Sequence, residues 1–323
     1  NTPVRESILD RITHLEDSLY LELPQAPRLC DDMDIEKKYV DIGEVKLYCE
    51  IEGSGTPMVL INGGPGGSHH AFHPWLSSAK NNFKIIYYDQ RGCGMSDYEP
   101  RGGYSFEQAV NDLEQLRQAL EIKKWILVGH SYGGGLAQYY TIKYPEQVIG
   151  QVLVGSVPMM NLSEFDGGRD QEFYSDAESE KLAEMLGLVR NRKINIAQYM
   201  FNKDINGGWK RQYFYKPTRE RLAQFGLYGF ISDPSYSSDW GAYDFENAFL
   251  DCPVPTLILE GKYDLVWKAD RPTIMSKYHP NARTVVFETS GHNIFADETE
   301  RFVDEIRQWS KTAKSVPRAK VNS

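Results

Sequence analysis

The sequence predicts an α/β fold in which a mostly parallel sheet is flanked by helices and carries an inserted helical cap. Short, unbroken apolar runs recur along the chain, and such runs are typical of strands buried on both faces of a parallel sheet. Helical patterns lie between the runs, as expected where strand and helix alternate. Between residues 158 and 250 the composition shifts toward Tyr, Phe, Trp, Asp and Arg, with weak strand signals. The simplest account of this stretch is a helical cap inserted between two strands of the sheet.

The first predicted element is an N-terminal helical extension over residues 1–30. It carries an apolar stripe at helical spacing, formed by Ile8, Ile12, Leu15 and Leu19. The core follows in two parts, residues 31–157 and 251–323. Its predicted strands are residues 40–42, 45–51, 58–61, 83–88, 125–128, 152–154, 256–259 and 284–287, with a hairpin at Gly43 between the first two.

The predicted helices of the core are residues 106–120, 136–144 and 298–312. The cap, residues 158–250, has helical stretches at 178–188 and 219–227. A chain of 323 residues buries enough surface to fold without a disulfide or a metal.

Composition and charge exclude several classes of protein. Hydrophobic residues make up 41% and charged residues 25%, which excludes a disordered or collagen-like chain. No apolar run approaches the roughly 18 residues that a membrane helix needs. The 36 basic and 45 acidic residues give a net charge of −9, which disfavours nucleic acid as a partner because phosphates would repel the chain.

The cysteines and the N-terminus bear on the compartment. The four cysteines, Cys30, Cys49, Cys93 and Cys252, show neither a C-x-x-C pair nor the spacing of metal ligands. We interpret them as structural thiols and leave a disulfide open. We expect a cytoplasmic protein, or a secreted or periplasmic one if a leader was removed before Asn1.

The strongest local signal is the pentapeptide G-H-S-Y-G at residues 129–133, directly after the predicted strand 125–128. In a strand–turn–helix context this pattern holds its serine on a sharp, strained turn above the sheet. The following helix would direct partial positive charge at the serine. We therefore predict Ser131 to be a catalytic nucleophile, against the alternative of a glycine-rich turn with an incidental serine.

A nucleophilic serine needs a base, and the base needs a carboxylate that orients it. In this type of fold the chain order is Ser, acid, His. Asp264 follows the strand 256–259, and His292 follows the strand 284–287. Both lie past the carboxyl ends of strands, where α/β sheets place their active sites. We predict these two residues to complete a triad, with Glu260 as a nearby rival for the acid.

The loop N-G-G-P-G-G at residues 62–67 supplies a third element of the site. A tetrahedral intermediate needs two N–H donors aimed at its oxyanion. We assign these donors to the backbone amides of Gly64 and Tyr132. A phosphate-binding loop is rejected because the Lys and Ser/Thr of a P-loop are missing.

Three histidines, His69, His70 and His73, follow this loop. His69 and His73 would share a helix face and could form a metal pair. No third ligand pattern accompanies them, so we interpret them as residues of the rim or of a helix surface. We expect no metal ion and no cofactor.

Two motifs resemble those of a known family. N-G-G-P-G at residues 62–66 and D-Q-R-G-C-G-M-S at residues 89–96 together resemble the proline iminopeptidase group of α/β-hydrolases, which are serine peptidases. The second motif is fairly specific to that group, whereas the remaining motifs are shared with esterases, lactonases and lyases of the same fold. The likeness runs over residues 38–155 and 251–310. Asn62 departs from it, because the family has a histidine there.

The resemblance implies a Ser-His-Asp aminopeptidase that binds the free amino terminus of its substrate through acids of the cap. Asp233 sits roughly where such an acid is expected. We expect a small-molecule or short-peptide substrate with a small or proline first residue. A carboxylesterase or lactonase using the same triad remains open, as does a non-catalytic ligand receptor on a hydrolase fold.

Overall fold

The computed structural model describes most of the predicted core and separate parts of the predicted cap. The described residues are 28, 30–31, 33–99, 103–156, 158–159, 176–194, 198–199, 215, 224–225, 227–233, 236–245, 247–264, 266 and 271–313. The predicted helix of the N-terminal extension lies outside these residues, as does much of the predicted cap. The domain boundaries therefore stay predictions.

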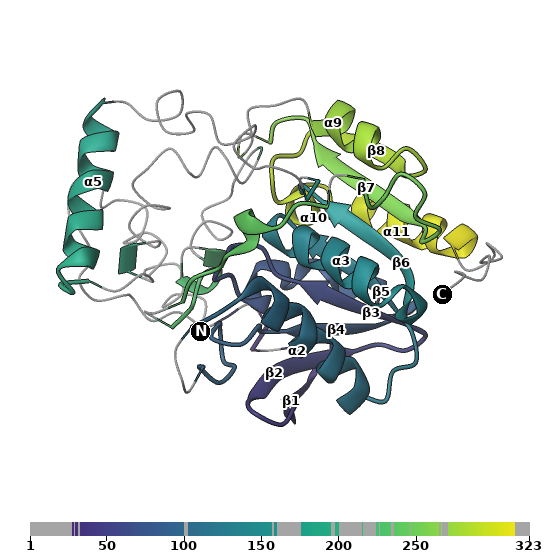
Figure 1. Cartoon of the computed structure of the whole chain (residues 1–323), viewed down its shortest axis with the longest axis horizontal. Helices are drawn as coiled ribbons and strands as arrows, with labels where there is room; N and C mark the ends of the chain where they lie inside the picture. Colours follow the sequence, from purple (N-terminus) through teal and green to yellow (C-terminus); the bar gives the residue numbers. More distant parts are fainter. Residues whose placement is uncertain are drawn as a thin grey trace.

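Eight strands form one sheet in the order β1-β2-β4-β3-β5-β6-β7-β8 (Figure 1). β2 pairs antiparallel with β1 and with β4, and every other neighbouring pair is parallel. The strands are β1 (Glu36–Asp41), β2 (Lys46–Glu52), β3 (Thr56–Ile61), β4 (Phe83–Tyr88), β5 (Trp125–His130), β6 (Val148–Val154), β7 (Thr256–Gly261) and β8 (Arg283–Phe287). The predicted mostly parallel sheet is confirmed.

The central strands are buried on both faces, which explains their unbroken apolar runs. All residues of β5 and β7 are buried. Alternate residues of β5 enter opposite cores: Ile126 and Val128 pack in one, whereas Trp125 and Leu127 pack in the other. This alternation follows from the two-residue period of a strand.

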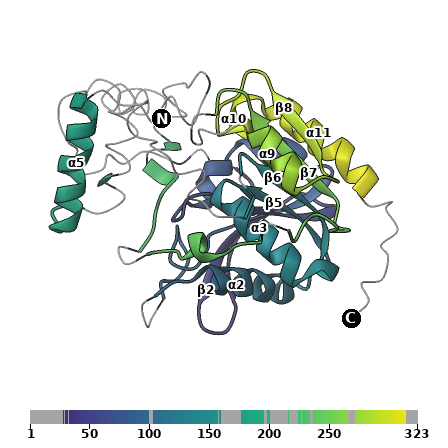
Figure 2. The ribbon, with the colours of Figure 1, turned by 45° about the horizontal axis from the view of Figure 1, so that its top comes forward.

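Helices cover the two faces of the sheet (Figures 1 and 2). α2 (Phe106–Ala119), α3 (Tyr132–Lys143) and α9 (Arg271–Tyr278) contribute to one core. α10 (Ile294–Asp297) and α11 (Thr299–Ala313) contribute to the other, with the 3₁₀ helix η2 (Trp75–Ala79). The buried stripe of α11 consists of Phe302, Val303, Ile306, Trp309 and Ala313, spaced as one helix face requires.

The remaining described helices are short or belong to the predicted cap. The 3₁₀ helices are η1 (His69–Phe72), η3 (Pro145–Gln147) and η5 (Trp240–Ala242). α5 (Asp176–Arg190) covers the helical stretch predicted at 178–188 and stands apart from the sheet in both views (Figures 1 and 2). Among the described helices, none combines the length and the apolar character that a bilayer crossing requires.

The cysteines are free thiols, which resolves the open question of a disulfide. Cys30, Cys49 and Cys93 are buried, and Cys252 is half-buried.

Candidate active site

Ser131 occupies the turn between β5 and α3, with φ 53° and ψ −120°. A non-glycine residue rarely adopts a positive φ, and such strain is concentrated at functional sites. Two backbone contacts hold the turn. The Ser131 N–H donates to the Val154 carbonyl at 2.9 Å, and the Ser156 hydroxyl donates to the Ser131 carbonyl at 3.0 Å.

Gly129 and Gly133, two positions before and after Ser131, must be glycines because other parts of the backbone lie too close for a side chain. A Cβ at Gly129 would lie 2.3 Å from the Gly133 carbonyl oxygen. A Cβ at Gly133 would lie 2.2 Å from the carbonyl oxygen of Ile61, at the end of β3. The two glycines of the pattern G-x-S-x-G therefore allow the start of α3 to pack directly against the ends of β5 and β3.

Asp264 and His292 lie against each other after β7 and β8. The Asp264 Oδ2 is 2.7 Å from the His292 Nδ1, and both residues are buried. The other carboxylate oxygen of Asp264 accepts the Val266 N–H at 2.9 Å. A carboxylate on Nδ1 fixes the tautomer of the imidazole, so that Nε2 carries the lone pair.

The Asp264–His292 pair borders the turn that contains Ser131. A Cβ at Gly155 would lie 3.1 Å from the His292 Nδ1 and 3.2 Å from the Asp264 Oδ2. Gly155 directly follows Val154, the residue that accepts the Ser131 N–H. The main chain of Ser131 and the Asp264–His292 pair, which come from distant parts of the chain, thus both lie at the end of β6.

His130 is a supporting residue whose role the sequence did not indicate. Its Nε2 lies 3.1 Å from the carbonyl oxygen of His292, and the two rings are 4.6 Å apart. Burial lowers the pKa of His130 to about 3. The ring is therefore neutral near pH 7 and donates its Nε2 proton to the main chain of His292, which it helps to position.

The loop after β3 passes beside the nucleophile. A Cβ at Gly63 would lie 3.3 Å from the Cβ of Ser131. Gly64 has φ +132°, and a Cβ there would lie 2.5 Å from the Gly66 nitrogen, so the loop needs glycine at this position. Tyr132 is the first residue of α3, and N–H groups in a first turn have no acceptor inside the helix. These are the two residues predicted to supply oxyanion donors.

Asn62 replaces the family histidine and anchors this loop. Its side-chain NH₂ donates to the Tyr88 main-chain carbonyl at 2.8 Å, and the main-chain carbonyl of Asn62 accepts from the Gln90 side-chain NH₂ at 3.2 Å. Asn62 therefore ties the loop to the end of β4.

The site and sheet match a known family. A family model described as alpha/beta hydrolase fold matches residues 56–299, which is more than half of the chain. The chain belongs to the α/β-hydrolase fold family.

Two relatives of the hydrolase are similar over most of its length. A proline iminopeptidase of Saccharolobus solfataricus is 27% identical over 289 residues, covering 86% of this chain and 93% of that protein. A proline iminopeptidase of Lactobacillus delbrueckii subsp. bulgaricus is 28% identical over 302 residues, covering 86% and 98%.

Solved structures share the fold of the hydrolase. An esterase from Exiguobacterium antarcticum has a TM-score of 0.64 at 24% identity and covers 85% of this chain and 100% of its own. A proline iminopeptidase from Mycobacterium smegmatis has a TM-score of 0.63 at 19% identity, with coverage of 86% and 99%. The comparisons confirm the predicted resemblance to the proline iminopeptidase group and the class of serine hydrolase.

The D-Q-R-G-C-G-M-S motif of the hydrolase forms a loop that organises the surroundings of the site. The Asp89 carboxylate accepts the N–H groups of His69 and Met95, each at 2.8 Å. Gly94 has φ +54°, and a Cβ there would lie 2.1 Å from that carboxylate. Arg91 binds the Asp112 carboxylate through two hydrogen bonds of 2.8 Å, which ties the loop to α2.

This loop also holds the segment that contains Asp233. The Gly94 N–H donates to the Ile231 carbonyl at 2.7 Å, and the Asp233 N–H donates to the Gly92 carbonyl at 2.8 Å. The Asp233 carboxylate accepts the Tyr104 hydroxyl at 2.5 Å. Asp233 is thus fixed to the core by both its main chain and its side chain.

The placement of His69 and His73 differs from the prediction of rim or helix-surface residues. Both are buried, with exposed fractions of 0% and 3%. His69 lies in the short 3₁₀ helix η1 and His73 directly follows it. No pattern in the sequence points to the buried carboxylates that bind them: the His69 Nδ1 is 2.9 Å from the Asp89 carboxylate, and the His73 Nε2 is 2.9 Å from that of Glu50.

Proposed function

We propose that the hydrolase is an aminopeptidase of proline iminopeptidase type, which releases an N-terminal proline or small residue from short peptides or amino-acid amides. The observation that carries the proposal is the 2.7 Å contact between Asp264 and His292 beside the strained Ser131. This contact supports base-assisted attack by a serine. The names of the similar proteins support the choice of substrate.

In the proposed first half-reaction, the Ser131 Oγ attacks the carbonyl carbon of the scissile amide. His292 takes the hydroxyl proton on Nε2, and Asp264 stabilises the resulting imidazolium. The backbone amides of Gly64 and Tyr132 donate hydrogen bonds to the developing oxyanion, a contribution worth about 3–4 kcal/mol per donor in such sites. His292 then returns the proton to the leaving amine as the C–N bond breaks.

In the second half-reaction, water replaces the amine. His292 accepts a proton from the water as its oxygen attacks the acyl-enzyme, and the proton returns to the Ser131 Oγ when the ester bond breaks. The products are a free amino acid and the shortened peptide or amine.

Asp233 is our candidate for the group that binds the substrate's ammonium. Its carboxylate, held by the Tyr104 hydroxyl, would recognise a cation through a charge-assisted hydrogen bond. This interaction would confine cleavage to the first residue, because an acylated amino terminus offers no positive charge.

A carboxylesterase or lactonase is the second candidate, favoured by the His130 of the elbow, since G-H-S-x-G is common in esterases. Both candidates use the same residues and differ in the scissile bond and in the need for a free amine.

A parallel substrate screen tests the proposal. We expect the full chain to cleave proline and alanine arylamides, to leave their N-acetylated counterparts intact, and to lose all turnover in Ser131→Ala. A fluorophosphonate probe should label the native chain and not this variant. Turnover of p-nitrophenyl esters without arylamide cleavage would identify an esterase instead, and an unlabelled native chain would point to a ligand receptor.

A further inference from the structure

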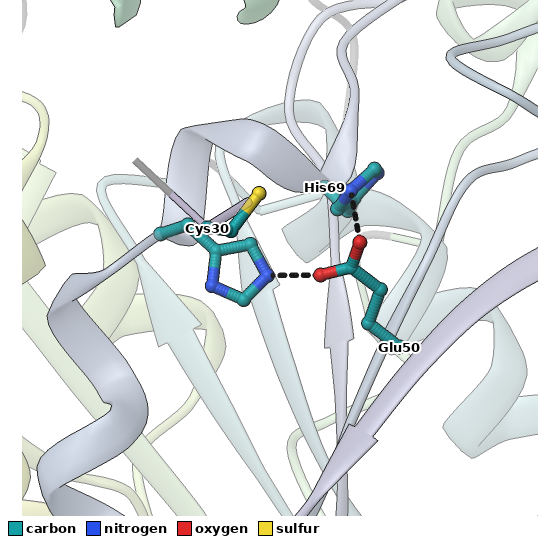
Figure 3. A group of neighbouring side chains, drawn as sticks. Cys30, Glu50 and His69 are labelled. Atoms are coloured by element: carbon teal, nitrogen blue, oxygen red, sulfur yellow. Dashed lines mark ion pairs between the residues drawn. The ribbon is translucent and has the colours of Figure 1, made fainter. Parts of the chain in front are cut away.

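Four buried side chains that take no part in the proposed reaction converge beside η1 (Figure 3). They are Cys30, Glu50, His69 and His73, and we refer to them as the four-residue cluster. Each contributes one donor atom, and these atoms all lie within 4.8 Å of one another. The residues come from three separate places: the segment before β1, strand β2, and the loop after β3.

The contacts inside the four-residue cluster are ion pairs between Glu50 and the two histidines. The two carboxylate oxygens of Glu50 face one histidine each, at 3.4 Å from the His69 Nε2 and 2.9 Å from the His73 Nε2 (Figure 3). Although these ion pairs are close, the two Nε2 atoms and the Glu50 Oε2 are buried and none of them makes a hydrogen bond of good geometry. Buried polar atoms in native proteins are almost always partnered, so an additional group is expected among them.

Neighbouring side chains hold the donor atoms of the four-residue cluster in place, as the residues around a metal-bound ligand do. The His69 Nδ1 lies 2.9 Å from both oxygens of Asp89, so its proton is held there and Nε2 faces Glu50 as the ligating atom. The Tyr48 hydroxyl donates to the Glu50 Oε1 at 2.7 Å. The His73 ring stacks on Tyr87 with a centroid distance of 4.0 Å. Carboxylates that hold the second nitrogen of an imidazole are typical of metal-bound histidines.

We propose that the four-residue cluster binds a divalent metal ion, with Zn²⁺ as the ion that fits it best. One sulfur, two imidazole nitrogens and one carboxylate oxygen form a mixed set that suits this borderline ion and its tetrahedral geometry. Bond lengths of roughly 2.0–2.3 Å place tetrahedral donors about 3.3–3.8 Å apart. The cluster needs only small side-chain movements to reach that spacing.

The charges of the proposed site balance. On binding, Cys30 releases its thiol proton to solvent, and the thiolate and the Glu50 carboxylate together offset the two positive charges of the ion. Neutral histidines complete the set. The ion and its four donors together are neutral, so they add no uncompensated charge to the interior. The adjacent Asp89 carboxylate is held by the His69 ring and by the N–H groups of His69 and Met95.

The proposed role is structural, because four protein donors leave no position for a substrate or a reacting water. The ion would join the segment around Cys30 to β2 and to the loop that continues from Gly64 to His69. It would therefore stabilise the chain and brace one side of the active-site loop without entering the reaction.

Metal content and cobalt spectroscopy test this inference on the full, tag-free chain. We expect about one Zn²⁺ per chain after growth with zinc. Replacement by Co²⁺ should produce intense visible bands of a tetrahedral centre and a near-ultraviolet thiolate-to-cobalt band. In Cys30→Ser the thiolate band should vanish, and zinc content should fall at least tenfold after dialysis.

The matched control is Cys252→Ser, which removes a thiol outside the cluster and should keep the ion and both spectra. Zinc should also raise the melting temperature of the chelated native chain and not that of Cys30→Ser. A native chain that binds neither ion, or a thiolate band that survives Cys30→Ser, would overturn the inference and leave a metal-free set of ion pairs. Fluorophosphonate labelling of Ser131 reports the proposed reaction separately, so the two proposals can fail independently.

Discussion

At the scale of single residues, Ser131 shows how the backbone prepares a side chain for chemistry. Its φ of 53° costs roughly 1–3 kcal/mol relative to ordinary conformations. Neighbouring interactions offset this cost: the hydrogen bonds from Ser131 to Val154 and from Ser156 to Ser131 fix both of its peptide groups. The strained conformation is therefore a property of the surrounding fold, in which Ser131 is buried.

Replacing Asp264 by a residue of the same size separates an effect on catalysis from an effect on folding. In Asp264→Asn the side chain keeps its size, but the amide can donate its own proton to the His292 Nδ1, which favours the wrong tautomer. We expect kcat to fall by about 10³–10⁴-fold, as in other serine hydrolases altered in this way. Steady-state kinetics on an arylamide, with the melting temperature measured in parallel, checks this expectation.

Glu260, the rival acid in the sequence, provides the control. Glu260→Gln should retain kcat within about tenfold, since the carboxylate that contacts His292 belongs to Asp264. The assignment fails if Asp264→Asn keeps a tenth of the native kcat, or if the two variants lose activity equally. His130 does not complicate the measurement near neutral pH, because burial lowers its pKa to about 3 and leaves it uncharged.

At the scale of elements, α3 lies so close to the segment directly after β6 that no side chain fits at Gly134. A Cβ at Gly134 would lie 2.1 Å from the Ser156 Oγ and 2.4 Å from its Cβ. This approach places the first turn of α3, and with it Ser131, directly over the end of β6. The packing of one helix on one strand thus determines where the nucleophile lies.

Gly134→Ala tests this packing. We expect a loss of about 1–3 kcal/mol in the free energy of unfolding, because the added methyl group overlaps Ser156. Combining it with Ser156→Gly removes both overlapping atoms and should recover at least about 1 kcal/mol relative to the sum of the single variants. Urea unfolding of the four proteins gives the coupling. Strictly additive effects would mean that α3 can move away from β6 at little cost.

α3 also shows why an element can be predicted only in part. The sequence placed its start at residue 136, whereas the helix begins at Tyr132. Gly133, Gly134 and Gly135 have low helix propensity, so no helical pattern is visible at these positions. Tertiary packing overrides that propensity, since only glycines allow the approach to β3 and β6. The strands β5 and β7, by contrast, were predictable because burial on both faces requires apolar residues throughout.

At the scale of the whole molecule, predictability depends on whether a site leaves a regular pattern in the sequence. The order of Ser131, Asp264 and His292 follows from a fold in which strand ends meet at one edge. The four-residue cluster has no such order. Glu50 lies on β2, His69 and His73 follow β3, and Cys30 lies in the segment before β1, so the folded chain brings together residues that no sequence spacing connects.

The stability of the whole molecule should fall in mild acid because two buried histidines, His130 and His279, resist protonation. Burial lowers the pKa of His279 to about 4. This residue stacks on Phe249 and lies 3.0 Å from the Gln138 side chain. In the unfolded chain the pKa returns to about 6.5, so the unfolded state binds more protons below that pH. The stabilising contribution is complete above about pH 6.5 and is lost as the pH falls toward 4.

We therefore expect the free energy of unfolding to drop between pH 7 and pH 5, with His279 accounting for about 2 kcal/mol of the loss. Urea unfolding at both pH values in the native chain and in His279→Gln isolates this share, because carboxylates and the remaining histidines titrate alike in the two proteins. The introduced glutamine can still donate to Gln138 but does not titrate. The free energy of unfolding of His279→Gln should therefore decline less steeply with acid than that of the native chain. Equal pH dependence of the two free energies of unfolding would contradict this prediction. It would mean that His279 binds its proton as readily in the folded state as in the unfolded state, despite its burial beside Phe249.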